Sequence, residues 1–579
     1  MASQSSETSV QGLVHDLEQG SLAIMVRRTL LIVGVLAIAA IYIIFKFRGL
    51  EHGMGMDQAQ IAREIARGKG FTTQTIRPLA IAQLEDHGKQ IDGTRFPDTY
   101  HAPLNPLVEA PLMFFVKKGW NTEAKNQEII YAGDRLIAIL AILFFLGAVL
   151  INYFTARRLF DERLAVFGTG LTLVTDLFWK YSMSGLPQML MLLIFSVIIH
   201  LVVRAISAKT EGRAFGLTLS GIGALFGLLM LTHGLTAWIL LGFVFYVALT
   251  FTPRLINGLL VLAVALAVYS PWVARNMKVS GTPFGVSYYA ELDEVKQSEA
   301  AWMRQPTTTL GIGVSWFRSK LTEQTIDQSG RLLMLLGAGI AAPMFFVSLM
   351  HRFKRKETAD LRWALLSMWV FAFLGMTLAG QNDALISANQ LHILFIPFML
   401  FYGMAMLLIL WGRLDIHLQY AREAFITVIF LVSSVQLILT LLPKGTSVAF
   451  AWPPYCPPII ALLNKWMQPD EVIASDMPYA VAWYADRKSI WLPNSVEDFN
   501  AINDYNQLGM QINGLYLTPV TSRLGLFPNV ASGEYKNWSG IILRNGQSLA
   551  KFPLKAFVPL PISGESIFYS DRERWAKGS

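Results

Sequence analysis

The sequence has a single cysteine and few charged residues, and each scarcity excludes something. With Cys456 alone, neither an intrachain disulfide nor a cysteine-based zinc site can form. Only 15% of the 579 residues are charged and 53% are hydrophobic, whereas a soluble chain carries about 25% charged residues. Much of the surface therefore faces something less polar than water, and lipid is the simplest candidate. The net charge of +8 resides largely in short loops between apolar runs, so it is a topology signal and no sign of nucleic-acid binding.

Apolar runs of nearly spanning length recur along the chain. Arg27 and Arg28 precede the first run, and no small-residue cleavage site follows it, so we expect an uncleaved first span. We predict about eleven spans, at 30–45, 129–154, 164–179, 186–203, 215–231, 235–251, 255–273, 332–350, 363–378, 391–411 and 425–442.

The loops between these runs alternate in charge. Basic residues gather in the loops at 157–163, 204–213, 254, 352–362 and 413–422, whereas the short loops around Ser184, His233 and Asn382 are poor in Lys and Arg. Basic loops stay on the cytoplasmic side during insertion. We therefore expect a multi-pass protein of the cell inner membrane with a cytoplasmic N-terminus and, after an odd number of spans, an outer C-terminus.

The expected fold class is an α-helical polytopic membrane protein with a C-terminal extracytoplasmic α/β domain. We place a cytoplasmic segment at 1–28, a transmembrane module at 29–442 with large outer loops at 46–128 and 274–331, and the α/β domain at 443–579. In that last region, strand-like runs at 472–474, 489–492 and 514–517 alternate with helical patterns at 478–485 and 496–508. Such alternation predicts a small, mostly parallel sheet.

The first outer loop contains two notable segments. Residues 56–68 form a helical pattern that Gly68 ends, and Asp57 stands at its start, near the outer membrane surface. The carboxylate of Asp57 is either a helix cap that accepts the backbone N–H of Gln60, or a catalytic group. In the later run YHAPLNP, two prolines stiffen the chain, so His101 is either part of a rigid connector or a catalytic residue.

An ordered set of motifs carries a family resemblance. The runs are MDQAQIAREIARGKGF, YHAPLNPL, AGDRLIAIL with Arg135, SPWVARNMKVSGTPFG with Arg275 and Asn276, and VIASDMPYAVAWYADRKSIWLP. In this order they resemble the C-type (GT-C fold) polytopic membrane glycosyltransferases. The similarity is to the bacterial branch related to protein O-mannosyltransferases and lipid A aminoarabinose transferases.

The resemblance implies inverting transfer of a hexose-class sugar from a polyprenyl-phosphate donor to an acceptor hydroxyl on the outer side of a bacterial inner membrane. By position, Asp57 is the general base. A phosphate leaving group needs no general acid, but it does need nearby cations. The implied partners are the bilayer, the polyprenyl-phosphate sugar and a glycan, lipid or protein acceptor. No cofactor is required, and the need for a divalent cation stays open.

Several outer-side residues are candidates for binding the donor phosphate, because an arginine fork donates two parallel hydrogen bonds. Arg275 is the first choice, and each candidate has the alternative of being an ordinary exposed or interfacial arginine. The others are Arg63, Arg95 and Arg77. Secondary site candidates are His101, Tyr100, Asp176, Asp383 and His392, and for His392 a simple hydrogen-bonded interfacial role is the alternative. No metal-ligand motif is present.

The sequence also departs from the family pattern. Gln58 follows Asp57 where the family commonly has Glu, 186–188 lacks an Asp that often stands there, and Leu391 and His392 replace an Arg–Tyr pair. These departures favour an alternative, a catalytically inactive GT-C relative that acts as an accessory or structural subunit of a membrane complex. A transporter is a third hypothesis, but the predicted spans have nearly uncharged centres and no repeat.

Overall fold

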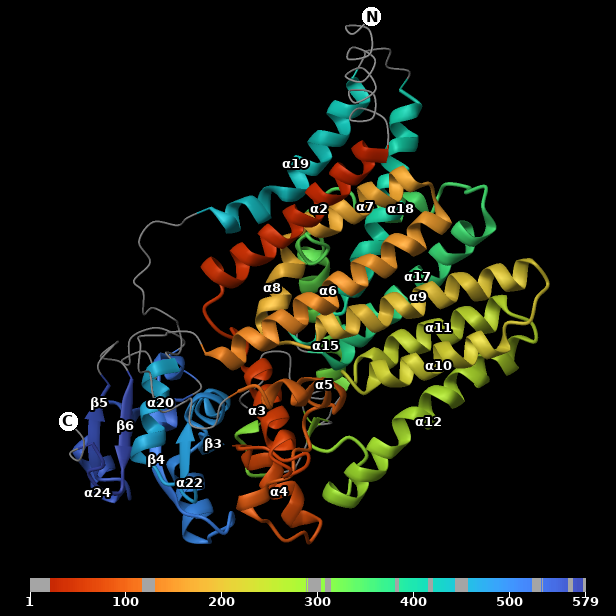
Figure 1. Cartoon of the computed structure of the whole chain (residues 1–579). Coiled ribbons are helices and arrows are strands. Elements are labelled where there is room, and N and C mark those ends of the chain that lie inside the picture. The colour runs from red at the N-terminus through yellow and green to blue at the C-terminus, as the bar shows by residue number, and fades with distance from the viewer. Residues whose placement is uncertain are drawn as a thin grey trace, which may run out of the picture. The chain divides into compact units, whose positions relative to one another are not determined.

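A computed structural model of the chain is shown in Figure 1. It describes residues 21–116, 131–287, 289, 303–307, 314–380, 385–414, 420–442, 457–522, 533, 535–560 and 566–575. The described chain divides into two compact units. The smaller comprises the residues up to Phe47 and a short stretch that begins at Ile438, and the larger contains the rest.

In the smaller unit, helix α2 (Ser21–Ile41) continues into a short π-helix, η1 (Tyr42–Lys46). Lys46 Nζ donates a hydrogen bond to the carbonyl of Leu442 at 2.8 Å. The first predicted span is thus helical, and no interruption divides α2 from η1.

The larger unit is mostly helical. Six helices of the described chain are long and apolar enough to cross a membrane: α6 (Ala132–Leu159), α9 (Gln188–Thr210), α12 (Arg254–Ser280), α17 (Lys356–Ala379), α18 (His392–Gly412) and α19 (Ala421–Leu441). Two shorter apolar helices, α10 (Gly216–Met230) and α11 (Thr236–Thr250), pack between them. The expected polytopic character is confirmed, and the number eleven stays a prediction.

Two predicted spans are divided. The run at 164–179 falls on α7 (Glu162–Val174) and α8 (Asp176–Ser184), which meet at an extended Thr175. The run at 332–350 is wrong as a single helix, because α15 (Val314–Leu335) ends early and α16 (Met344–Ser348) follows after a turn. Gly337 and Ala338 both have positive φ in that turn, a conformation that ends helices.

The first outer loop folds into four helical segments and a strand. These are α3 (Gly53–Ala66), β1 (Thr75–Ile76), α4 (Pro78–Asp86), η2 (Gly93–Arg95) and α5 (Leu104–Met113). Helix α3 begins four residues before Asp57 and ends as expected. Gly68 N–H bonds the carbonyl of Ile65, and Lys69 N–H bonds that of Glu64, the pair of bonds that closes a helix when glycine adopts a left-handed conformation.

A six-stranded sheet combines this loop with the C-terminal residues, in the order β1-β3-β2-β4-β6-β5. The C-terminal strands are β2 (Val472–Ser475), β3 (Lys488–Trp491), β4 (Ile512–Leu517), β5 (Ala556–Pro559) and β6 (Ile567–Ser570). The three predicted strands are present and mutually parallel, and β5 and β6 add an antiparallel edge. Strand β1 pairs in parallel with β3, so the first outer loop supplies one edge of a sheet that the sequence assigns to 443–579 alone.

Eight helical segments accompany the sheet in the described C-terminal residues. They are α20 (Pro457–Trp466), α21 (Pro478–Ala480), η4 (Val481–Ala485), α22 (Val496–Asp504), η5 (Pro519–Ser522), η7 (Lys536–Trp538), α23 (Ser539–Ile542) and α24 (Gly546–Lys551). Every residue of β2 is buried, as in parallel strands covered on both faces. Figure 1 shows α3 and α4 beside this sheet, and α3 contacts α21 and η4. The loop and the sheet therefore form one rigid support for the residues of α3.

Candidate active site

Helix α3 carries Asp57 in its second turn. The N-cap is His52, whose Nδ1 accepts the N–H of Met54 at 3.3 Å. The cap interpretation of Asp57 is therefore wrong: the helix starts earlier, so the Asp57 carboxylate is free to bond elsewhere. A Cβ added to Gly55 would lie 2.6 Å from the carbonyl oxygen of Ser184, so only glycine lets α3 pack this closely on the turn between α8 and α9.

The carboxylate of Asp57 is buried and bonded on both oxygens. Gln60 Nε2 donates to Oδ1 at 3.1 Å, and the Arg77 guanidinium forms a short ion pair with Oδ2. Arg77 follows β1 directly and caps α4, so the sheet fixes its position. Its guanidinium also lies over the ring of Tyr100, 4.4 Å from the centroid, a cation–π contact.

The run from Asp98 to His101 forms a tight turn next to this pair. Asp98 Oδ1 accepts the backbone N–H groups of Tyr100 at 3.1 Å and His101 at 2.8 Å. Its Oδ2 lies 3.2 Å from His101 Nδ1 and 3.5 Å from an Arg77 nitrogen. The other ring nitrogen of His101, Nε2, lies 3.6 Å from Asp57 Oδ2. Asp57, Arg77, Asp98 and His101 thus form one buried group, called here the Asp57 cluster.

The electrostatics of the Asp57 cluster favour charged side chains. Burial would raise the pKa of the Asp98 carboxyl, but the charge and hydrogen bond of His101 and the charge of Arg77 lower it to about 2. Burial likewise opposes the charge on Arg77, yet the carboxylates of Asp57 and Asp98 raise the pKa of its guanidinium. Opposite charges at these distances stabilise each other strongly when water is excluded.

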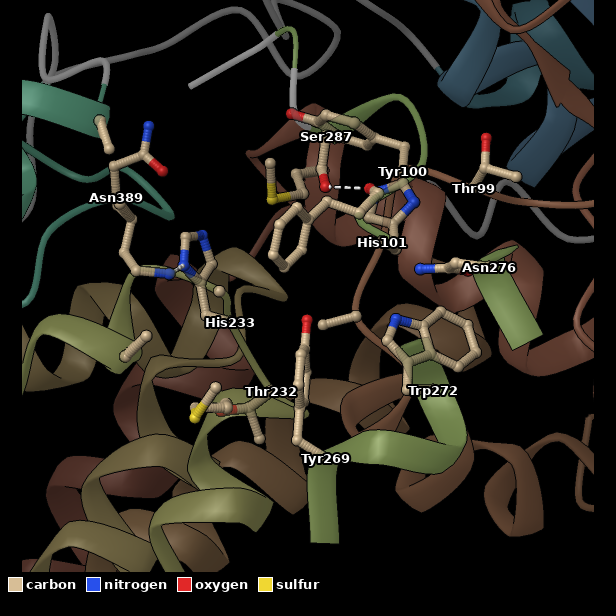
Figure 2. Close-up of a pocket in the computed structure, with 18 of the residues that line it drawn as sticks. Thr99, Tyr100, His101, Thr232, His233, Tyr269, Trp272, Asn276, Ser287 and Asn389 are labelled. Atoms are coloured by element: carbon tan, nitrogen blue, oxygen red, sulfur yellow. Dashed lines mark hydrogen bonds between the residues drawn. The ribbon is translucent and has the colours of Figure 1, made fainter. Parts of the chain in front are cut away.

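A cavity of about 220 Å³ lies against the Asp57 cluster. Figure 2 shows its lining: Tyr269, Trp272 and Asn276 from α12, Thr232 and His233 from the turn between α10 and α11, and Thr99, Tyr100 and His101 from the first outer loop. Gln58, Ser287 and Asn389 also line it, whereas Asp57 itself does not. The lining is aromatic and rich in uncharged hydrogen-bonding groups.

His233 is one of these uncharged groups. Burial, and to a lesser extent the charge of His101, lowers the pKa of His233 to about 4. Its Nδ1 accepts the N–H of Leu235 at 3.3 Å, so the proton of the neutral ring is on Nε2. His233 therefore gives the cavity wall a neutral N–H donor.

Arg275, the first choice for the donor phosphate, is next to this cavity but already bonded. Its guanidinium donates to the carbonyls of Asp98 at 2.5 Å and Phe71 at 3.2 Å, and to Asn276 Oδ1 at 2.9 Å. It thereby joins the end of α12 to the turn that carries His101. Burial lowers the pKa of Arg275, and the charge of Asp98 opposes the shift.

The other predicted arginines are dispersed. Arg63 donates to the carbonyls of Trp483 and Ala482 and pairs with Asp486, so it fastens α3 to the C-terminal residues. Arg95 is exposed in η2. Arg77 alone among the three belongs to the Asp57 cluster.

The secondary candidates also separate. Tyr100 and His101 line the cavity. Asp176 pairs with Lys180 at 2.6 Å, at the start of α8. His392 is buried at the start of α18, where Nδ1 accepts Trp369 Nε1–H at 3.1 Å and Nε2 lies 3.3 Å from Gln328 Oε1. Neither Asp176 nor His392 lines the cavity, and Asp383 lies outside the described residues.

The sequence interpretation missed two acidic residues. Asp98 holds His101, and its position two residues before the Tyr-His pair was the available signal for a side-chain-stabilised turn. Glu109 is buried in α5, where Asn105 Nδ2 bridges it to Gln58 with distances of 2.9 and 2.7 Å. It is the lone charge-bearing residue of an apolar helix, which was itself a signal. Burial raises the pKa of Glu109 to about 8, although the bond from Asn105 opposes the shift.

Across the described residues, no group of three or more His, Cys, Asp or Glu side chains is arranged to hold a metal ion. In the Asp57 cluster, the guanidinium of Arg77 bonds both carboxylates.

The motifs suggested the GT-C fold, and this chain shares that fold with solved structures. A family model described as dolichyl-phosphate-mannose-protein mannosyltransferase matches residues 127–274. This segment contains Tyr269 and Trp272 of the cavity but not Asp57 or His101.

Two solved structures share the fold over nearly their whole length. ArnT from Cupriavidus metallidurans in the apo state is 11% identical, with 95% of this chain and 98% of that chain covered and a TM-score of 0.53. The same protein bound to undecaprenyl phosphate is 10% identical, with 95% and 100% covered and a TM-score of 0.54. AglB from Archaeoglobus fulgidus, in complex with an inhibitory peptide and a dolichol-phosphate, is 13% identical over 87% of this chain and 71% of that chain, at a TM-score of 0.48. No curated protein sequence matches this chain significantly.

Proposed function

We propose that the chain is a glycosyltransferase of the bacterial inner membrane. It transfers a hexose-class sugar from a polyprenyl-phosphate donor to an acceptor hydroxyl on the outer side, with inversion. The observation that carries this proposal is the Asp57 cluster, a buried group of acid–base residues against a cavity lined by aromatic and uncharged polar side chains. The shared fold with ArnT, one structure of which binds undecaprenyl phosphate, supports the donor class.

The cavity suits a neutral sugar. Trp272 and Tyr269 offer ring faces on which the C–H face of a pyranose packs, and aromatic faces of this kind contribute both burial and geometry. Asn276, Asn389 and the N–H of His233 supply uncharged donors and acceptors for hydroxyl groups. A mostly apolar pocket with a few oriented polar groups is the usual form of a small-molecule site.

The chemistry requires one base and one source of positive charge. The acceptor oxygen attacks the anomeric carbon, the bond from that carbon to the phosphate oxygen breaks, and polyprenyl phosphate leaves with the electron pair. The hydroxyl proton passes to the Asp57 cluster, within which the family resemblance implies Asp57 as the base. Arg275, bonded to the cavity residue Asn276, is the proposed cation for the phosphate, while Arg63 and Arg95 stand away from the lining.

Replacing Asp57 tests this function. In liposomes that contain undecaprenyl-phosphate-linked radiolabelled hexoses, we expect Asp57→Asn to lower sugar transfer by at least about a hundredfold, the usual scale for a general base. Asp176→Asn is the matched control, because this acid pairs with Lys180 outside the cavity lining. Transfer within threefold of the parent protein in Asp57→Asn would exclude Asp57 from the reaction.

Loss of fold must be separated from loss of chemistry. Asp57→Asn leaves Arg77 with Asp98 as its remaining carboxylate, and breaking a buried ion pair costs about 3–5 kcal/mol. The thermal midpoint and the elution profile of each variant therefore accompany the assay. A variant that elutes and unfolds like the parent but transfers no sugar assigns the defect to the reaction.

The alternative of an inactive accessory subunit has one observation in its favour. Arg275, Arg63 and Arg77 already bond partners within the chain, so a phosphate must compete with existing contacts. This alternative predicts that the purified protein captures no undecaprenyl phosphate from liposomes and keeps a protein partner in mild detergent. Lipid capture that Arg275→Gln abolishes would exclude it.

A further inference from the structure

We infer that Nε2 of His101 is the atom that takes the proton from the acceptor hydroxyl, with Asp98 as the positioning residue behind it. The inference rests on the proposed glycosyl transfer and deepens it, because it separates the roles of Asp57 and His101. Asp57 becomes the neighbouring charge that stabilises the protonated imidazole.

The first argument is an unused buried nitrogen. His101 Nε2 is buried and has no hydrogen-bond partner among the described residues, although its ring belongs to the cavity lining. The other nitrogen, Nδ1, is held by Asp98 at 3.2 Å, so in the neutral ring Nδ1 carries the proton and Nε2 the lone pair. A buried polar atom without a partner is unfavourable, and a bound hydroxyl group would satisfy it.

The second argument concerns access. A general base must reach the proton that it removes. Asp57 does not line the cavity, and its oxygens already accept from Gln60 and Arg77. His101 is the member of the Asp57 cluster that lines the cavity.

The third argument is charge. Two carboxylates and one guanidinium leave the Asp57 cluster with one net negative charge while His101 is neutral. A proton on His101 neutralises the cluster and lies between Asp98 on one side and Asp57, at 3.6 Å, on the other. A histidine that acts as the base becomes positively charged in the transition state, and flanking carboxylates stabilise this imidazolium.

The acceptor O–H bond breaks, its proton joins His101 Nε2, and the oxygen forms a bond to the anomeric carbon as polyprenyl phosphate departs with the electrons of the broken C–O bond. The imidazolium then releases its proton to water once the product leaves. Asp57 and Asp98 stay ionised throughout.

The charged and titratable groups that face His101 come from several elements. Asp57 belongs to α3, Arg77 precedes α4, and Asp98 and Tyr100 lie on the same turn as His101. His233, from the turn between α10 and α11, interacts with it electrostatically. Of these groups, the two carboxylates favour the imidazolium and Arg77 opposes it.

Two substitutions isolate Nε2. In His101→Asn the amide nitrogen takes the place of Nδ1 and keeps a donor for Asp98, while Nε2 is lost; in His101→Gln the amide takes the place of Nε2. With undecaprenyl-phosphate hexose as donor, we expect each variant to lose about 10²–10⁴-fold in kcat, with the donor KM within about threefold. His87→Asn, an exposed histidine of the same outer loop, is the control and should retain the parent kcat.

The pH profile distinguishes a base from a structural histidine. The parent kcat should fall on the acid side as His101 becomes protonated, and this acid limb should be absent from the residual activity of His101→Asn. Asp98→Asn removes a negative charge beside the ring, so the limb should move to lower pH, and Asp98→Glu should restore it. An acid limb that persists unchanged in His101→Asn, or a kcat within threefold of the parent, overturns the inference and leaves Asp57 as the direct base.

A measurement without turnover completes the test. In protein labelled with ¹⁵N-histidine in nanodiscs, the resonance absent from His101→Asn identifies this ring. Its Nδ1 should carry the proton in the neutral form, and Asp57→Asn should make protonation of the ring harder. The opposite tautomer overturns the inference even if sugar transfer is observed. If the parent protein turns over no lipid-linked sugar, the proposed function is contradicted. The tautomer measurement then still tests which nitrogen of His101 carries the proton.

Discussion

The two halves of helix α3 contain similar types of residue, but these residues have different roles. Its first half carries Asp57 and Gln58, of which Gln58 lines the cavity. Its second half carries Arg63, which bonds carbonyls of the C-terminal residues, and Glu64, which pairs with Arg67 and Lys69. In the second half, Arg63 and Arg67 both pair with Asp486, and Lys69 pairs with Glu64 at 2.6 Å. Burial opposes ionisation of Asp486, but the two arginines outweigh it and hold the pKa of its carboxyl far below its usual value.

The two halves differ in which buried polar atoms lack a hydrogen-bond partner. In the second half, the charged side chains pair with one another or with backbone carbonyls, and the Nε of Arg63 is an exception. Near the first half, His101 Nε2 is buried without a hydrogen-bond partner, and its ring lines the cavity. Glu109 Oε2, on α5, is also buried without a hydrogen-bond partner but does not line this cavity. Buried polar groups are normally paired, so an unpaired atom at a cavity favours chemistry, whereas closed pairs favour support.

Arg63→Ala should have the largest effect on stability, and it tests whether the second half of α3 is structural. It removes the hydrogen bonds that Arg63 donates to the carbonyls of Ala482 and Trp483 and weakens the pairing of Asp486. We expect a loss of about 3 kcal/mol in the free energy of unfolding, at the low end for a buried pair because Arg67 still holds Asp486. Thermal unfolding in detergent measures it.

Activity decides what Arg63 does. The folded fraction of Arg63→Ala should transfer sugar at close to the parent rate, and Arg67→Ala, at a more exposed position, should destabilise less. A stable Arg63→Ala protein without transfer activity would show instead that Arg63 binds the donor phosphate, as the sequence analysis allowed. The second half of α3 would then not be purely structural.

The sequence predicts some elements of the fold well and others not at all. Apolar runs predict the long helices because burial in lipid depends on composition. They fail at 332–350, where the turn at Gly337 and Ala338 does not lower the mean hydropathy enough to reveal itself. Strand β1 was not predictable, because two residues acquire strand structure only by pairing with β3, far along the chain.

In the candidate site, too, residues whose role depends on contacts distant in the chain could not be predicted from sequence. Asp57, Arg77 and His101 were named from sequence, but Asp98 was not, because its importance arises from contacts with Arg77 and His101 that β1 and the turn bring about. The partners of the candidate arginines could not be predicted either. A sequence shows that Arg63 is on the outer side, yet it does not show that carbonyls of η4 already occupy its guanidinium.

On the cavity side, Trp272→Leu should weaken substrate binding by a moderate amount. An aromatic face contributes up to about 1.5 kcal/mol beyond area burial, which corresponds to about tenfold in the donor KM. Trp272→Phe keeps a ring and should recover most of the loss, and Trp363→Leu, an exposed tryptophan of α17, should have no effect. An unchanged KM in Trp272→Leu would place the sugar elsewhere.

The smallest expected effect concerns Glu109 of α5, whose Oε2 is buried without a hydrogen-bond partner. Because burial raises the folded-state pKa of its carboxyl to about 8, the neutral form is favoured, and its contribution to stability is complete below the unfolded pKa of about 4.5. That contribution is lost as the pH rises through 8, since the unfolded chain ionises first.

Glu109→Gln keeps the shape and an acceptor for Asn105 but cannot ionise. We therefore expect equal thermal midpoints for parent and variant at pH 4.5 and a higher midpoint for the variant at pH 9, by roughly 2–4 °C for each kcal/mol recovered. Glu497→Gln, at an exposed position of α22, should show no such divergence. A midpoint for Glu109→Gln that falls below that of the parent at alkaline pH would mean that an ionised Glu109 is stabilised by a partner. Glu109 would then resemble the paired charges of the second half of α3 and not a buried group without a partner.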